Sequence, residues 1–138
     1  MKVSDLMSTK CVAVYGGDSI QKISEEMAKN NRGLVVVLNN MDDRKVVGVV
    51  SNKDIINKVI SKKRDPETVF ATDIMSKECV AISPDKPTID AIMLMRKHNI
   101  KRVIVIEDEL LQGIISSHDL LDEMVKYKKQ LLDMAIDF

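Results

Sequence analysis

The apolar positions of this 138-residue chain fall into two patterns, which together predict the same series of elements twice. Ile20, Ile23 and Met27 recur at intervals of three and four residues, which is the spacing of one helix face. Unbroken β-branched runs are instead typical of strands buried on both faces of a sheet. The elements predicted for the first half are a strand at 11–14, a helix at 18–30, strands at 34–38 and 46–50, and a helix from 51 to about 60.

The second half repeats this order, and the repeat can be followed residue by residue. Asp5-Leu6-Met7-Ser8 matches Asp73-Ile74-Met75-Ser76, and the later elements match at a slightly shorter offset because the turn between the paired strands is shorter. The predicted elements are a strand at 79–82, a helix at 86–98, strands at 103–107 and 111–115, and a helix from 117. We therefore predict an α/β (α+β) chain of two β-α-β-β-α repeats, with repeat 1 at 1–62, a linker at 63–70, repeat 2 at 71–125 and a helical extension at 126–138.

The composition is that of a soluble globular protein. Apolar residues make up 45% and charged residues 30%, and 21 basic residues balance 21 acidic ones, so net charge does not favour nucleic acid as a partner. Aromatic residues, at 3%, are too few to stack a series of bases. The N-terminus has no apolar signal segment and the apolar runs are only strand-sized, so we expect a cytoplasmic protein without a membrane span.

Each half carries the pattern Gly-h-h-Ser-x-x-Asp, where h is aliphatic, at the point where a strand passes into a helix. The positions are Gly48, Ser51 and Asp54 in the first half and Gly113, Ser116 and Asp119 in the second. A carboxylate at a helix start can accept both hydroxyl protons of a ribose diol in charge-assisted hydrogen bonds, and the glycine is expected to leave room above it. Ser-x-x-Asp is also a helix capping box, so the residues alone do not distinguish a site that binds a sugar from a helix cap.

Several features in order resemble a tandem pair of CBS domains, the family named after cystathionine β-synthase. They are the Asp-(Leu/Ile)-Met-Ser opening, the methionine-bearing first helix, Lys101-Arg102-Val103-Ile104-Val105, and Gly-h-h-Ser-x-x-Asp in both halves, over about residues 1–125. The resemblance implies two repeats packed sheet to sheet about a pseudo-twofold axis, with clefts between them. In that family the clefts bind AMP, ADP, ATP or S-adenosylmethionine as a regulatory ligand, and no cofactor is required.

The resemblance also implies roles for individual residues. Asp54 with Ser51, and Asp119 with Ser116, would hold the ribose of the ligand. The adenine would lie along Cys11, Val12 and Ala13 in one half and Cys79, Val80 and Ala81 in the other. Lys101 and Arg102 precede a buried strand and would reach the ligand phosphates, whereas the matching first-half positions are Gly33 and Leu34, with Arg32 as a substitute. We therefore expect one cleft to bind a phosphorylated ligand better than the other.

The remaining candidate residues indicate neither catalysis nor a metal site. Cys11 and Cys79 lack a metal-binding spacing and are interpreted as core residues, with a disulfide between them as the alternative. His98 is interpreted as a solvated helix end, and His118 as an exposed first-turn residue or, alternatively, as a ligand contact or pH sensor. No nucleophile elbow, zinc-protease motif or glycine-rich phosphate loop is present, so we do not expect an enzyme.

The last helix continues an apolar stripe beyond the repeat. Its members are Leu120, Leu121, Met124, Val125, Leu131, Leu132, Ala135, Ile136 and Phe138. The stripe either folds back on its own core or forms a dimer or partner surface, and the resemblance implies a homodimer. The function expected is that of a regulatory module for an adenosine ligand, acting on an unknown protein partner. The alternatives are a ligand-free structural or interaction module and, least supported, a nucleic-acid binder.

Overall fold

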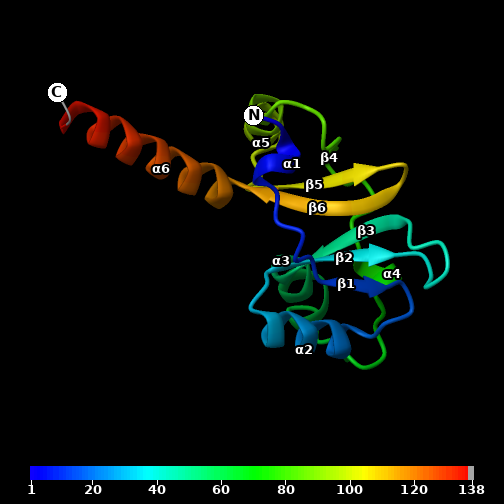
Figure 1. The fold of residues 1–138 in the computed structure, drawn as a ribbon. Coiled ribbons are helices and arrows are strands. Elements are labelled where there is room, and N and C mark those ends of the chain that lie inside the picture. The colour runs from blue at the N-terminus through cyan, green and yellow to red at the C-terminus, as the bar shows by residue number, and fades with distance from the viewer. Residues whose placement is uncertain (137–138) are drawn as a thin grey trace. The chain divides into compact units, whose positions relative to one another are not determined.

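The computed structural model describes residues 1–136, and its contacts divide the chain into two compact units. Unit 1 contains residues 1–9, 80–107 and those from 112 onward, and unit 2 contains residues 10–79 and 108–111. Each unit has a three-stranded sheet with helices beside it, so the predicted α+β class and its duplication are confirmed (Figure 1).

Unit 2 is built on the sheet of the first repeat. Its elements are β1 (Ala13–Tyr15), α2 (Ile20–Asn30), β2 (Leu34–Leu38), β3 (Val46–Ser51), α3 (Asn52–Ile55), the π-helix η1 (Ile56–Ile60) and α4 (Ala71–Ile74). The strand order is β1-β2-β3, with β1 parallel and β3 antiparallel to the central β2. Helix α2 begins where Ser19 Oγ accepts a hydrogen bond from the Lys22 amide (3.1 Å), and it ends at Asn31 in the left-handed conformation.

Unit 1 is built on the sheet of the second repeat. Its elements are α1 (Val3–Leu6), β4 (Ala81–Ile82), α5 (Thr88–His98), β5 (Arg102–Glu107), β6 (Leu110–Ser116) and α6 (Ser117–Ile136), although the first two residues of β6 belong to unit 2 by their contacts. The strand order is β4-β5-β6, with β4 parallel to β5. Helix α5 ends at a left-handed asparagine, Asn99, as α2 does.

Each unit has its own apolar core between sheet and helices. The core of unit 2 consists of Val14, Ile20, Ile23, Met27, Val35, Val37, Val50, Ile55, Val59, Val69, Ala71 and Ile74. The core of unit 1 consists of Val3, Ile82, Ala91, Met95, Val103, Val105 and Ile115. Burial of these aliphatic side chains is the main force that stabilises each unit.

The sequence patterns do not predict the two short helices α1 and α4. Each of them packs in the unit that is built on the sheet of the other repeat. Helix α4 opens the second repeat, yet its Ala71 and Ile74 lie in the core of unit 2, and Val3 of α1 lies in the core of unit 1. Asp5 and Asp73 cap these helices by accepting hydrogen bonds from the Lys2 and Phe70 amides (2.8 Å each). The segment that opens each repeat therefore completes the unit built on the other repeat's sheet.

The Met-Ser dipeptide after each short helix covers the glycine of the Gly-h-h-Ser-x-x-Asp pattern. Ser8 exchanges two backbone hydrogen bonds with Ile114 (2.8 and 2.9 Å). A Cβ on Gly113 would lie 2.6 Å from the Ser8 carbonyl oxygen, and one on Gly48 would lie 2.8 Å from the Met75 sulfur. The expected free space above the glycine is thus filled by the protein itself, and close backbone approach explains why glycine is required.

This close approach makes Gly113→Ala a destabilising change. A backbone carbonyl cannot move aside as a side chain can, so we expect the free energy of unfolding to fall by about 1–3 kcal/mol, as in other overpacked sites. Gly17→Ala is the matched control, because nothing lies within 4 Å of its added Cβ. Chemical denaturation measures both, and equal stability of the two variants would contradict the assigned contact.

Candidate functional site

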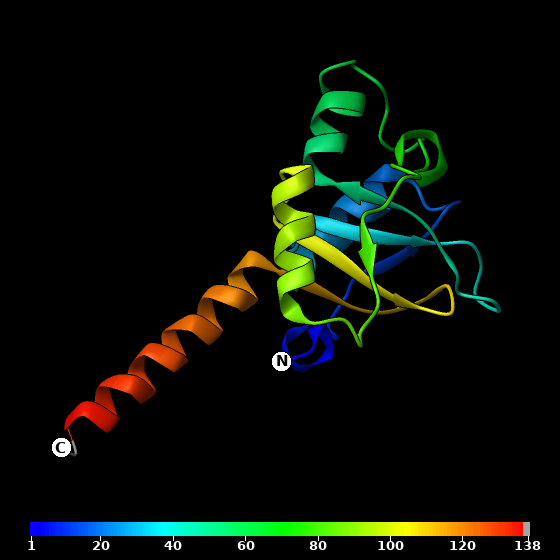
Figure 2. The same cartoon turned by 90° about the horizontal axis from the view of Figure 1, so that it is seen from above.

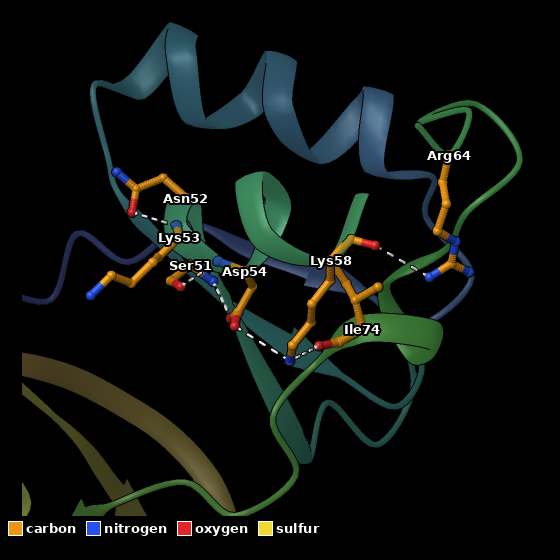
Figure 3. Close-up of polar contacts among 7 residues, drawn as sticks. All are labelled: Ser51, Asn52, Lys53, Asp54, Lys58, Arg64 and Ile74. Atoms are coloured by element: carbon orange, nitrogen blue, oxygen red, sulfur yellow. Dashed lines mark hydrogen bonds and ion pairs between the residues drawn. The ribbon is translucent and has the colours of Figure 1, made fainter. Parts of the chain in front are cut away.

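In unit 2, the predicted ribose residues form the start of α3. The Ser51 amide donates to Asp54 Oδ2 (2.9 Å), and the Asp54 amide donates to Ser51 Oγ (3.1 Å), which is a reciprocal capping box (Figure 3). The Asn52 amide donates to the Gly33 carbonyl (2.9 Å) and so fixes the beginning of β2 beside the same helix start. The hydroxyl and carboxylate are therefore brought together as predicted. They form a helix cap, which was one of the two alternatives from sequence.

In unit 1, Ser116 and Asp119 repeat this arrangement with one hydrogen bond more. Asp119 Oδ2 accepts from both the amide and the hydroxyl of Ser116 (2.9 Å each), and the Asp119 amide lies 3.2 Å from Ser116 Oγ. The Ser117 amide donates to the Lys101 carbonyl (2.9 Å), which places Lys101 and the adjoining Arg102 at this helix start. The structure therefore brings the candidate ribose and phosphate residues of the second repeat to one place.

The two carboxylates differ in what surrounds their second oxygen. Lys58, which is not among the residues expected from sequence, lies with its Nζ 3.4 Å from Asp54 Oδ1 and donates to the Ile74 carbonyl (2.9 Å, Figure 3). Asp119 Oδ1 has no polar partner among residues 1–136. The residue that matches Lys58 in the second repeat is Glu123, so no cation is supplied there. The i,i+4 Asp-Lys spacing is the sequence signal that identifies this pair.

The predicted adenine residues lie at the start of each parallel strand pair. The Val12 carbonyl accepts from the Val36 amide (3.0 Å) and the Val80 carbonyl accepts from the Ile104 amide (3.2 Å). Both valines also pack against the cores of their units. Ala13 and Ala81 are exposed, and Ala81 lines a hollow of about 540 Å³ beside α5 whose lining does not include Ser116 or Asp119.

The cysteines are half-buried thiols, and neither is in a disulfide bond within the described residues. Burial raises the pKa of the Cys11 thiol, an effect that the nearby positive charge of Arg32 partly opposes. Burial also raises the pKa of Cys79. Both thiols are therefore poor nucleophiles at neutral pH. Arg32 lies close enough to act on Cys11, so its positive charge is near the candidate adenine segment of the first repeat.

No group of histidine, cysteine and acidic side chains in residues 1–136 has the arrangement of a metal site. His98 and His118 are both exposed. None of the helices in this part of the chain is long and apolar enough to cross a lipid bilayer.

Both halves of the chain match a known protein family. The family model described as CBS domain matches residues 3–61 and again residues 71–126. The chain belongs to the CBS-domain family. The CBS domain-containing protein YhcV of Bacillus subtilis is 29% identical over 118 residues, which cover 86% of this chain and 81% of that protein.

Solved structures, among them one of a CBS domain protein, have the same fold. The crystal structure of an uncharacterized conserved protein from Pyrococcus horikoshii is similar with a TM-score of 0.80 at 28% identity, covering 89% of this chain and 91% of that one. The CBS domain protein PAE2072 from Pyrobaculum aerophilum, whose structure is a complex with AMP, has a TM-score of 0.78 at 28% identity, covering 87% and 90%. The predicted CBS-domain pair is thereby confirmed.

Proposed function

We propose that this CBS-domain pair is a regulatory module that binds an adenosine-containing ligand at its Ser-x-x-Asp helix starts. The observation that carries the proposal is the set of polar groups gathered around Asp119. Its carboxylate is held by Ser116 through Oδ2, its Oδ1 is available to accept hydroxyl protons, and Lys101 and Arg102 stand at the same helix start. The AMP complex of PAE2072 supports AMP as the first ligand to test.

The Asp119 site is the stronger of the two. A ribose diol at Asp54 competes with Lys58 for Oδ1, and a partly exposed ion pair of this kind contributes up to about 1 kcal/mol, which corresponds to roughly fivefold in affinity. The phosphates of a ligand at Asp119 also meet Lys101 and Arg102, whereas Gly33 and Leu34 occupy the matching positions of the first repeat, with Arg32 as the candidate substitute. The predicted inequality of the two sites thus has a second cause, independent of Lys101 and Arg102.

The module is not an enzyme and acts as a homodimer on a protein partner. Ligand binding alters the equilibrium between conformations of the chain only by the difference in affinity for them. The exposed apolar residues of α6 support association of the chain with itself.

Thermal unfolding with AMP, ADP, ATP and S-adenosylmethionine tests this function. A ligand at about 100 times its Kd should stabilise the chain by about 2.7 kcal/mol, which raises the Tm by about 8–10 °C for a chain of this size. GMP at the same concentration is the control for the adenine base.

A ligand-free interaction module is the second candidate, because both carboxylates already complete capping boxes. It predicts no change of Tm with any of the four adenosine compounds, the result that would contradict the proposed function.

A further inference from the structure

Helix α6 leaves most of its apolar side chains uncovered in unit 1. Leu120, in its first turn, packs against the core. Beyond it, Met124, Tyr127 and Leu131 are exposed to 66%, 62% and 47%. Figures 1 and 2 both show the helix extending away from β5 and β6, so the helix does not fold back on the core of its own unit.

The uncovered side chains follow a heptad spacing. Alternating intervals of four and three residues separate the members of what we call the α6 stripe: Leu120, Met124, Tyr127, Leu131 and Met134. This is the a/d pattern by which two helices pack side by side in a coiled coil. A stripe of this kind on an exposed helix indicates a surface that another helix covers.

Two charged residues, Glu123 and Lys128, line the same groove as the α6 stripe. Lys128 lies one turn from both Met124 and Leu131. No ion pair within residues 1–136 involves Lys128 or Glu123. Covering an unpaired charge is costly, so a partner that covers this face is expected to place an acidic group beside Lys128 and a basic group beside Glu123.

Four members of the α6 stripe, from Leu120 to Leu131, form one wall of a groove of about 700 Å³ in unit 1. The opposite wall consists of Met1, Leu6, Thr88 and Ile92, from the start of the chain, α1 and α5. Five stripe positions are few for a self-standing coiled coil, which usually extends over three or four heptads. A helix lying along α6 gains the additional apolar contact from this second wall.

We propose that the α6 helices of two copies of the chain pair in parallel, stripe against stripe, with Glu123 of each copy beside Lys128 of the other. In a parallel pair, a residue at position g lies next to the residue five positions later in the partner helix, at position e. Glu123 and Lys128 occupy these two positions. An antiparallel pair centred on the same stripe would bring the two Lys128 side chains together instead. The pairing does not depend on nucleotide binding.

Disulfide cross-linking tests the parallel orientation in the intact chain. In a background of Cys11→Ser and Cys79→Ser, Leu131→Cys places identical residues opposite each other, and mild oxidation should yield a covalent dimer. Lys129→Cys is the matched control, because residue 129 lies on the opposite side of the helix. The absence of a cross-link at residue 131, or equal cross-linking at residues 129 and 131, would overturn the proposal.

Charge exchange tests the proposed ion pair by sedimentation equilibrium of the full chain. Glu123→Lys and Lys128→Glu should each raise the dimer Kd roughly fivefold, because like charges then face each other twice in the dimer. The double variant should return the Kd to within about twofold of the original value, because the opposite charges are restored in reverse. A chain that stays monomeric at about 100 µM, or a double variant as weak as the single ones, refutes the pairing.

Discussion

Replacing Asp119 with asparagine is expected to weaken binding of the adenosine ligand roughly 10- to 100-fold, which corresponds to about 1.4–2.8 kcal/mol. Asparagine keeps an oxygen that can accept the hydrogen bonds now donated by Ser116, so the helix start should persist. It loses the negative charge that strengthens hydrogen bonds from the two ribose hydroxyls. Isothermal titration calorimetry measures the loss, and urea unfolding should show a stability within about 1 kcal/mol of the original chain.

Asp54→Asn is the matched control for this result. The substitution is chemically the same, but Lys58 already lies against Asp54 Oδ1, so a ligand gains less from that carboxylate. In Asp54→Asn, we expect the Kd of the tighter of the two sites, measured by calorimetry, to change by less than about threefold. Equal losses from the two variants would show that the Lys58 ion pair does not distinguish the sites. A loss of stability with unchanged affinity in Asp119→Asn would leave only the capping role.

The second large effect is expected at Ile74, in the short helix that opens the second repeat. Its side chain is 3% exposed and lies in the core of unit 2, among residues of the first repeat. Ile74→Ala removes buried methyl and methylene groups and leaves a cavity, so the free energy of unfolding should fall by about 2–5 kcal/mol. Such a loss is a large fraction of the stability of a typical domain.

Ile60→Ala provides the comparison for Ile74. Ile60 belongs to the same unit but is 57% exposed, so its truncation should change stability by no more than about 0.5 kcal/mol. Denaturant titrations of both variants followed by circular dichroism give the two values. If Ile74→Ala were as mild as Ile60→Ala, the exchange of opening helices between the repeats would be refuted.

The strands and long helices could be predicted because their apolar patterns are strong. The run at Leu34–Leu38 became β2 without a change of bounds, and the spacing of Ile20, Ile23 and Met27 identified α2. The predicted strands at 11–14 and 79–82 begin later, at Ala13 and Ala81. Short parallel strands carry too few residues for their apolar pattern to fix a boundary.

The opening helices could not be predicted, because four residues make a single turn and show no periodicity. Their position in the unit of the other repeat depends on contacts distant in sequence. The same contacts explain why glycine stands at positions 48 and 113, because the Met-Ser segments occupy the space that a side chain would need there. Sequence placed Ser-x-x-Asp at both helix starts correctly. The difference between Asp54 and Asp119 became visible only through the orientation of Lys58.

The most direct test of ligand binding at the second-repeat helix start is an NMR titration of the isotope-labelled chain with AMP. The amide signals of residues 101–103 and 116–120 should move in a saturable way, and those of residues 51–54 should respond only at higher AMP concentration. The absence of any saturable change at about 1 mM AMP, ADP, ATP or S-adenosylmethionine would contradict the proposed function. Changes confined to segments away from both Ser-x-x-Asp motifs would contradict the proposed site.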